Sequence, residues 1–341
     1  MTADAASVRT SPPTLHDVAR AAGVSLATAS RVLNGSERKV ADSFRERVER
    51  AADELGYTAN ASAQATARGT SAAIALLVAD IADPYFGLIA SGVARLADAA
   101  GLIVTVAITE RDPDREVRIL RALRGQRPRG VILAASRAES QGASSIAELS
   151  ALRALGGRTV TFGDGGDRSI RIDNRGGAER LGIQMAQLGY RRAIAIVAAA
   201  GVRTSDDRLA GFTAGFAAGG GEIDRVHRGS FEREAGAAAM TAALAEGVDA
   251  GTLVFALSDV IAVGAMTAIR DAGRRVGEDI AVCGFDDVPV SRDVTPRLTT
   301  VHVPLSDLGE QAFRAVIEPE WTQPPAALEV VVRESTPGVA P

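Results

Sequence analysis

The feature that most limits how this chain can fold is a series of short apolar runs, separated by segments of helical periodicity, that begins near residue 73. The runs are 73–79, 102–107, 130–134, 159–162, 193–197, 252–256 and 280–285. Intervals of about 20 to 60 residues between runs require crossover helices, which predicts parallel strands in sheets covered on both faces. Because the rhythm occurs up to Gly163 and again beyond it, we expect an α/β body of two similar lobes.

The segment before residue 70 has helical periodicity throughout and no β-branched run long enough for a strand. Thr14 is placed to cap a first helix, with Asp17 at the capping-box position and Gly23 ending it. A second helix is predicted to start near Ser25, and a third to cover about 42–55. The third helix is predicted to have one apolar stripe and a C-terminal glycine cap, made by Phe44, Val48, Ala51, Ala52, Leu55 and Gly56.

The segment 14–35, TLHDVARAAGVSLATASRVLNG, has the pattern of a helix-turn-helix. At about 100° per residue, the second helix has a packing face of Thr28, Ala29, Val32 and Leu33 and an opposite face of Leu26, Ala27, Ser30 and Arg31. The opposite face is suited to a DNA major groove, where arginine bonds guanine and small apolar side chains touch thymine methyl groups. The spacing alone fits an ordinary helical hairpin with an exposed polar face equally well.

Composition and charge narrow the class of protein further. Residues 1–13 lack the parts of a secretory signal, so we expect a disordered tail on a cytoplasmic protein. No apolar run approaches the roughly 20 residues of a membrane-spanning helix. The one cysteine, Cys283, lies in an apolar run, which favours a buried thiol in a reduced compartment. A net charge of −4 neither identifies nor excludes a nucleic-acid binder, because local patches bind phosphate.

Residues 14–70 closely resemble the DNA-binding headpiece of the lactose-repressor (LacI/GalR) family, through the helix-turn-helix, the ELGY of 54–57 and a short hinge segment led by Asn60. The resemblance covers nearly the whole chain after residue 13. It implies base contacts by Leu26, Ala27 and Arg31 in operator DNA. It also implies positions at or near phosphate for His16, Ser25, Thr28, Ser30 and Asn34, and further DNA contacts by Tyr57, Asn60, Ala63, Gln64, Thr66 and Arg68.

Two hinge residues depart from the family pattern. Thr66 stands where the family inserts a leucine wedge into the minor groove, and Ala59 replaces the usual proline before Asn60. Threonine is a poorer apolar wedge and a poorer helix former than leucine, which leaves open which side chain kinks the DNA.

The body resembles the family's core domain, which is itself similar to periplasmic sugar-binding proteins. The matching motifs all follow predicted strands or open helices: ADPYFG at 82–87, 162–164, RLAGF at 208–212, the SD of 258–259 and GFDD at 284–287. In open parallel sheets, ligands bind beyond the carboxyl ends of the strands. The resemblance therefore predicts a ligand site formed by Tyr85, Phe86, Asp164, Arg208, Ser258 and Asp286.

A sugar is the ligand class that this residue set favours. Carboxylates and a guanidinium bind hydroxyl groups in pairs, and an aromatic ring packs on the C–H face of a sugar. Each residue taken singly also fits a solvated loop charge or a helix cap. Ser258 replaces a common family asparagine and Val303 a common polar residue, so the ligand can be smaller, less polar or phosphorylated.

The predicted fold class is an all-α helix-turn-helix headpiece followed by a periplasmic-binding-protein-like α/β core of two parallel-sheet lobes. The predicted boundaries are a tail at 1–13, a DNA-binding domain at 14–58, a hinge at 59–70 and an effector-binding and dimerisation domain at 71–341. Within that domain, the N-lobe is expected at about 71–163 and 292–320, and the C-lobe at about 164–291 and 321–341. A helix at 305–317 and a strand at 327–332 are expected near the end. Family members with a leucine heptad after this point form tetramers, and none follows here, so the resemblance implies a homodimer.

Two other classes of protein fit less well. An exported sugar-binding protein would need a signal peptide and no headpiece. For an enzyme, the chain lacks a GxGxxG after a strand, a GxxxxGK[ST] loop and a metal-ligand cluster, and its three histidines have no paired nucleophile. We therefore predict a transcription regulator, by default a repressor, that is not an enzyme, needs no cofactor or metal, and responds allosterically to a small polar ligand.

Overall fold

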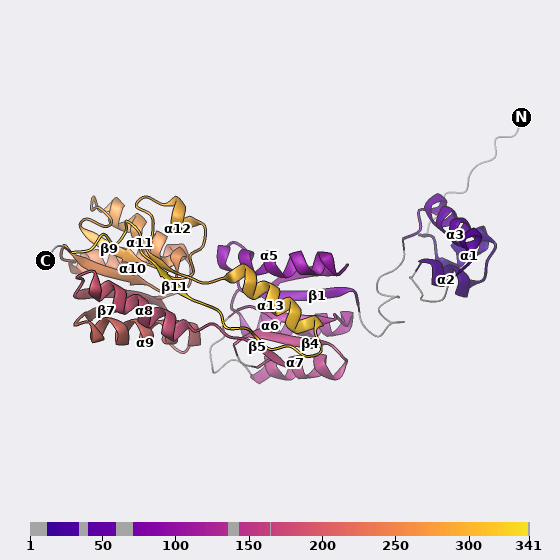
Figure 1. The fold of residues 1–341 in the computed structure, drawn as a ribbon, viewed down its shortest axis with the longest axis horizontal. Helices are drawn as coiled ribbons and strands as arrows, with labels where there is room; N and C mark the ends of the chain where they lie inside the picture. Colours follow the sequence, from indigo (N-terminus) through magenta and orange to yellow (C-terminus); the bar gives the residue numbers. More distant parts are fainter. Residues whose placement is uncertain (1–11, 34–39, 59–70, 136–142, 164, 340–341) are drawn as a thin grey trace, which may run out of the picture. The chain divides into compact units, whose positions relative to one another are not determined.

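The computed structural model describes residues 12–33, 40–58, 71–135, 143–163 and 165–339. The chain divides into two compact units, Met1–Ser71 and Ala72–Pro341. The described helices of the first unit, the headpiece, are α1 Leu15–Ala22, α2 Leu26–Leu33 and α3 Asp42–Leu55 (Figure 1).

The headpiece helices begin and end where the capping residues predict. Thr14 Oγ1 accepts from the Asp17 N–H at 3.4 Å, and the Thr14 N–H donates to Asp17 Oδ2 at 3.0 Å, which confirms the capping box. Gly23 and Gly56 end α1 and α3, each with a φ of 62°, in the left-handed region that glycine adopts without steric cost.

Small apolar side chains hold the three helices together, since Val18, Ala29 and Val48 are fully buried at their meeting point. Phe44 is the exception to the predicted stripe. Its side chain is 41% exposed, and its ring lies 5.6 Å from the Arg47 guanidinium carbon. The predicted stripe therefore packs in the core from Val48 onward, while Phe44, in the first turn of α3, is exposed.

The second unit, the body, alternates strands and helices along almost its whole length. Its elements are β1 Ala73–Val78, α5 Pro84–Ala99, β2 Ile103–Ile108, α6 Pro113–Gln126, β3 Gly130–Leu133, α7 Ala143–Ala154, β4 Arg158–Phe162, β5 Arg168–Ile170, α8 Asn174–Gln187, β6 Arg192–Ala198, α9 Arg203–Ala218, β7 Glu222–Gly229, α10 Arg233–Glu246, β8 Thr252–Ala256, α11 Asp259–Asp271, β9 Ile280–Cys283, α12 Val290–Asp293, β10 Thr300–His302, α13 Leu305–Ile317 and β11 Glu329–Val331.

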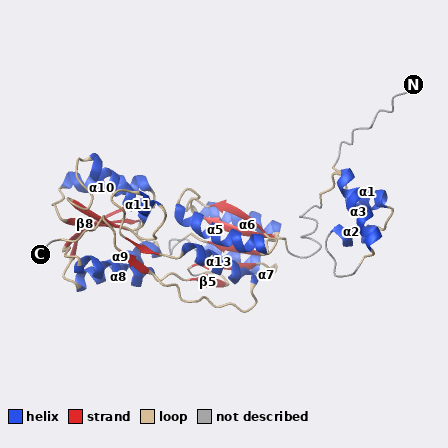
Figure 2. Cartoon of the chain, turned by 45° about the horizontal axis from the view of Figure 1, so that its top comes forward, coloured by secondary structure: helices blue, strands red, loops and turns tan. Residues whose placement is uncertain are grey.

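Two parallel sheets form the centres of the two lobes. The N-lobe sheet has the strand order β2-β1-β3-β4-β5, and the C-lobe sheet has the order β7-β6-β8-β9. Helices cover both sheets, drawn blue around the red strands in Figure 2. All seven apolar runs are confirmed as strands. Strands β3, β8 and β9 are buried at every residue, as expected for strands covered on both faces. Of these, β3 and β8 lie inside their sheets, and β9 ends its sheet, next to the bridge between Cys283 and Thr299.

The structure places the lobe boundaries differently from the sequence prediction. Strand β5 pairs with β4 in the N-lobe sheet, so the first crossing follows Ile170 rather than Gly163. Strand β10 pairs with β11, and its neighbour Thr299 bridges to Cys283 at the end of β9. Residues 299–302 therefore pack with the C-lobe, whereas the sequence assigned 292–320 to the N-lobe. These segments are short and polar and carry no periodicity that could have located the crossings.

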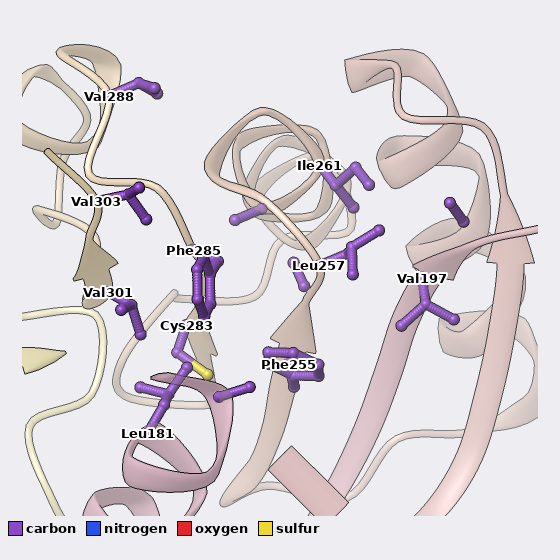
Figure 3. Close-up of a cluster of buried hydrophobic side chains, with 14 of the residues drawn as sticks. Leu181, Val197, Phe255, Leu257, Ile261, Cys283, Phe285, Val288, Val301 and Val303 are labelled. Atoms are coloured by element: carbon purple, nitrogen blue, oxygen red, sulfur yellow. The ribbon is translucent and has the colours of Figure 1, made fainter. Parts of the chain in front are cut away.

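A large aromatic and aliphatic cluster extends through both lobes, and Figure 3 shows part of it in the C-lobe. The rings of Phe212 and Phe255 stack with centroids 4.1 Å apart, and both side chains are fully buried. Cys283 lies in this cluster, and burial raises the pKa of its thiol, so the expectation of a buried thiol is confirmed.

Helix α13 brings the chain back from the C-lobe to the N-lobe, where it packs closely against α5 (Figure 1). A Cβ added at Gly92 of α5 would lie 2.0 Å from the Ser306 carbonyl oxygen. We expect Gly92→Ala to lower the free energy of unfolding by about 1–3 kcal/mol through overpacking. Gly125→Ala is the matched control, because a Cβ there meets nothing within 4 Å, and it should be neutral or stabilising. Equal urea midpoints for the two variants would contradict this account.

Candidate DNA-reading helix and effector cavity

The second helix of the headpiece presents its predicted outer face to solvent. Leu26 is 39% exposed, and Ala27 and Arg31 are also exposed, while Ser30 is half-buried. On the opposite face, Ala29 is fully buried, and Thr28, Val32 and Leu33 are half-buried. A large apolar side chain, a small one and a guanidinium therefore share one accessible face of a short helix, as base reading requires.

The remaining predicted DNA contacts have several different surroundings. The Ser25 Oγ accepts from the Thr28 N–H at 3.1 Å and lies 2.8 Å from Thr28 Oγ1, so it caps α2. His16 is exposed on α1, and Tyr57 is half-buried against the headpiece core. Six predicted contacts lie outside the described residues, namely Asn34, Asn60, Ala63, Gln64, Thr66 and Arg68.

In the body, the centre of the predicted ligand site is a buried ion pair between Arg208 of α9 and Asp286, which follows β9. Arg208 Nη2 donates to Asp286 Oδ1 at 2.7 Å, and the two side chains are 3% and 6% exposed. The other donors of Arg208 reach Asn174 Oδ1 at 2.8 Å and the Leu257 carbonyl oxygen at 2.9 Å. The guanidinium carbon also lies 3.9 Å from the centre of the Phe285 ring. Arg208 is thus held by four partners from three segments of the C-lobe, since Phe285 and Asp286 are neighbours in the chain.

The backbone at the end of β9 aims the Asp286 carboxylate. Asp286 has a φ of 111°, and its N–H donates to the Val301 carbonyl oxygen at 2.9 Å. This region of φ is costly for a side-chain-bearing residue, and such strain tends to be found at functional sites. Burial raises the pKa of Asp286 to about 6, even though Arg208 favours the charged form.

The predicted aromatic residues lie at the start of α5. Asp83 Oδ1 accepts from the Tyr85 N–H at 2.9 Å and caps this helix. The Tyr85 and Phe86 rings meet edge to face at 5.0 Å, but Phe86 is only 3% exposed and belongs to the N-lobe core. Burial raises the pKa of Tyr85, and the Asp286 charge adds to this, so the two groups are within electrostatic range. Ser258 Oγ caps α11 at 3.5 Å from the Ile261 N–H, and Asp164 lies outside the described residues.

A cavity of about 390 Å³ lies between the lobes, within the usual size range of small-molecule sites. Its N-lobe wall comes from the loop after β1, the start of α5 and the loop after β2, and its C-lobe wall from the loop after β7 and from α10, α11 and α12. The lining residues are Ala79, Asp80, Ala82, Asp83, Pro84, Glu110, Arg111, Phe231, Glu232, Arg233, Glu234, Val260, Val263 and Val290.

None of the predicted ligand residues that the structure describes lines this cavity. The cavity and the ion pair are nevertheless within electrostatic range of each other. Burial raises the pKa of Asp83 in the cavity wall, and the positive charge of Arg208 acts against this rise. The cavity, and not the ion pair, is the space that a ligand can occupy, because Arg208 and Asp286 are almost inaccessible and the guanidinium donors of Arg208 already have partners.

The sequence reasoning missed the aromatic residue that lines the cavity, Phe231. It follows β7, an edge strand of mixed polarity, EIDRVHRG, that gave no apolar run to mark its end. The Arg111 guanidinium carbon lies 3.9 Å from the Phe231 ring centre, so one residue from each lobe meets across the cavity. For Arg111, a signal was available in the sequence, because it lies in the short TERD segment that follows the second apolar run. The resemblance did not single this segment out.

None of the helices in the described part of the chain is long and apolar enough to cross a membrane. Among the same residues, no group of three or more histidine, cysteine, aspartate or glutamate side chains is arranged to hold a metal ion.

Comparison with known proteins identifies both units. Residues 14–60 match the family model of bacterial regulatory proteins of the lacI family, and residues 184–336 match a periplasmic binding protein-like domain. The chain is 32% identical over 336 residues to the transcriptional regulator CelR of Thermobifida fusca, covering 95% of this chain and 98% of CelR. It is 33% identical over 301 residues to GalR of Escherichia coli K12, covering 88% of this chain and 87% of GalR.

Solved structures agree with these matches. The lac repressor dimer bound to operator and the anti-inducer ONPF superposes with a TM-score of 0.81 at 26% identity, covering 96% of this chain and 99% of that one. A complex of the regulator CelR with cellobiose gives a TM-score of 0.66 at 31% identity, covering 95% and 99%. The headpiece with an exposed reading helix, the two-lobed α/β body and these relatives lead to one conclusion. The chain belongs to the lacI family of DNA-binding transcriptional regulators.

Proposed function

We propose that this regulator is a repressor that binds a palindromic operator as a homodimer and is controlled by a small sugar or sugar derivative. The observation that carries the proposal is the cavity between the two lobes, which is of small-molecule size and is lined by residues of both. A ligand that contacts both walls stabilises one degree of lobe closure over another, which is the differential binding that allosteric control needs. The CelR–cellobiose complex supports a sugar as the ligand class.

The DNA-binding part of the proposal rests on the exposed face of α2. Leu26, Ala27 and Arg31 are proposed to read bases in the major groove, and His16, Ser25, Thr28 and Ser30 to lie near phosphate. The lac repressor dimer bound to operator supports a dimer on a two-fold symmetric site. For the ligand, we propose that Arg208, Asp286, Tyr85 and Ser258 shape the base of the site, while Phe231 and Arg111 lie across its opening.

The proposal assigns no reaction to the chain, in keeping with relatives that are transcriptional regulators. It places the protein in the bacterial cytoplasm, where operator DNA is found. Turnover of a sugar phosphate or nucleotide by the purified protein would contradict the non-enzymatic part.

Operator selection from a random DNA library, followed by gel-shift titration with a sugar panel, tests the proposed function. We expect enrichment of a palindrome whose binding falls steeply with salt, because bound phosphates release counterions. At least one sugar should shift the operator affinity. An asymmetric selected site, or an affinity that no sugar changes, would contradict the dimer and the effector class respectively.

Replacement of Arg31 tests base reading. Arg31→Ala should weaken binding to the best operator by about 1–3 kcal/mol and relax sequence preference at one symmetric position in each half-site. The matched control is Arg20→Ala, which removes an exposed guanidinium from α1 in the same unit and should leave the preference unchanged. A uniform loss of affinity on all sequences for Arg31→Ala would show that it contacts phosphate only.

A further inference from the structure

The charges around the interlobe cavity are strongly unbalanced. Five acidic residues line it against two basic ones, namely Asp80, Asp83, Glu110, Glu232 and Glu234 against Arg111 and Arg233. The same cavity has an apolar surface supplied by Phe231 and by three valines at 260, 263 and 290. A ligand in this space therefore meets an aromatic face surrounded mainly by carboxylates.

Both lining arginines already have partners. The Arg111 guanidinium stacks on Phe231 and lies in the field of Asp83, Asp80 and Glu232, which act to hold its charge against the effect of burial. Arg233 Nη2 donates to Thr267 Oγ1 at 3.1 Å, and its Nη1 lies 3.8 Å from Glu234 Oε1. Behind the wall, Arg208 directs its donors to Asn174, Leu257 and Asp286. An incoming anion would have to displace these contacts to obtain a cationic partner.

Several lining carboxylates, by contrast, keep accepting capacity. Asp80 Oδ1 accepts from the Ala82 N–H at 2.9 Å, and Asp83 Oδ1 from the Tyr85 N–H at 2.9 Å. The ion pairs found in the described residues include neither of these carboxylates. Glu232 begins α10 without a side-chain capping bond. Each carboxylate has about four lone-pair positions, so acceptors remain for hydroxyl or ammonium donors.

We propose that the cavity takes an uncharged or positively charged polyol, of the free-sugar or amino-sugar class, and discriminates against phosphorylated sugars. This inference rests on the proposed function, in which the cavity is the effector site. A phosphate adds about −1.5 to −2 charges at neutral pH and would be desolvated among carboxylates, which is unfavourable. Hydroxyl and ammonium groups donate to the same carboxylates, and the C–H face of the sugar ring packs on Phe231 when Arg111 moves aside.

Titration calorimetry on the full-length protein tests this with chemically matched probes. The probes are glucose, glucosamine and glucose 6-phosphate, the corresponding galactose compounds, ribose with ribose 5-phosphate, and cellobiose. We expect a free or amino sugar to bind, and its phosphorylated partner to bind at least about 10-fold more weakly. A phosphorylated sugar that binds as tightly as its parent would overturn the inference and leave the proposed function standing. Binding by no probe would count against the sugar effector itself, and the inference would fall with it.

Two isosteric variants test whether the cavity charges cause the discrimination between free and phosphorylated sugars. Glu232→Gln removes one lining charge, and Glu246→Gln removes an exposed glutamate at the far end of the same helix, where it pairs with Arg225. Glu232→Gln should narrow the affinity ratio between the free and phosphorylated sugar by about 2- to 5-fold, and Glu246→Gln should not change it. Equal ratios in the two variants would show that the cavity carboxylates do not set the ligand class.

Discussion

Asp286→Asn is expected to leave operator binding intact and to remove most of the effector's influence on it. The substitution keeps the size and shape of the side chain but removes the charge that faces Arg208 at 2.7 Å and acts on Tyr85. A hydrogen bond to a charged group contributes about 1.5–3 kcal/mol, so effector affinity should fall by about 10- to 100-fold. Operator affinity should change little, because the variant leaves the headpiece surface untouched.

The pH dependence of effector binding gives a second readout at the same residue. Burial raises the pKa of Asp286 from 3.8 to about 6. Ionised Asp286 holds the Arg208 guanidinium at the base of the site more strongly than the neutral acid does, so wild-type effector affinity should fall as the pH drops through about 6. Asp286→Asn should lack this dependence. For stability the sign is opposite: ionising a group with a raised pKa is costly, so this destabilisation is present above about pH 6 and disappears as the pH falls below about 4.

The control for this experiment is Asp271→Asn, which alters an exposed carboxylate at the C-terminal end of α11. This variant should keep both the effector affinity and its pH profile. Thermal unfolding of each variant separates loss of binding from loss of fold, because removing one partner of a buried pair is destabilising. Unchanged calorimetric affinity in a folded Asp286→Asn protein would remove Asp286 from the effector site.

Local rules predicted the headpiece and the central strands well. Thr14, Asp17, Gly23 and Gly56 define helix ends through contacts within a few residues, which a sequence displays directly. The fully buried strands are equally visible, because burial on both faces requires an uninterrupted apolar run. Strands β5 and β7 were missed because their sequences, RSI and EIDRVHRG, mix polar with apolar side chains and give no apolar run, unlike the edge strands β2 and β9.

The ligand site was predictable only in part, for the same kind of reason. Arg208 and Asp286 follow recognisable motifs at element ends, and the structure brings them together from positions 78 residues apart. Phe231 and Arg111 meet only through the closure of two lobes, which is a property of the tertiary fold and not of any local pattern. Phe86 has an aromatic side chain in the expected motif, yet the turn into α5 directs it into the core, where it is 3% exposed.

Asp287→Asn is expected to be the most destabilising of these substitutions. The Asp287 side chain is 3% exposed and accepts from Arg292 Nη2 at 2.6 Å, from Ser291 Oγ at 3.0 Å and from Arg333, and it lies 3.1 Å from His302 Nδ1. One carboxylate therefore contacts α12, strand β10 and the C-terminal segment. Removing its charge leaves the nearly buried Arg333 and the exposed Arg292 with reduced compensation, and the free energy of unfolding should fall by about 2–3 kcal/mol.

The pH dependence of this effect distinguishes loss of charge from loss of packing. Burial acts to raise the pKa of Asp287, but the hydrogen bonds from Arg292 and Arg333 outweigh it and lower the pKa from 3.8 to about 2. A lowered pKa stabilises the fold above about pH 4, and this stabilisation is lost as the pH falls toward 2. The gap in urea midpoint between wild type and Asp287→Asn should therefore narrow below about pH 4. Asp249→Asn, at a carboxylate that is 77% exposed and pairs with Arg192 at 2.7 Å, should cost less than about 1 kcal/mol. A gap in urea midpoint that stays constant with pH would mean that Asp287 stabilises the contacts among α12, β10 and the C-terminal segment by its shape and not by its charge.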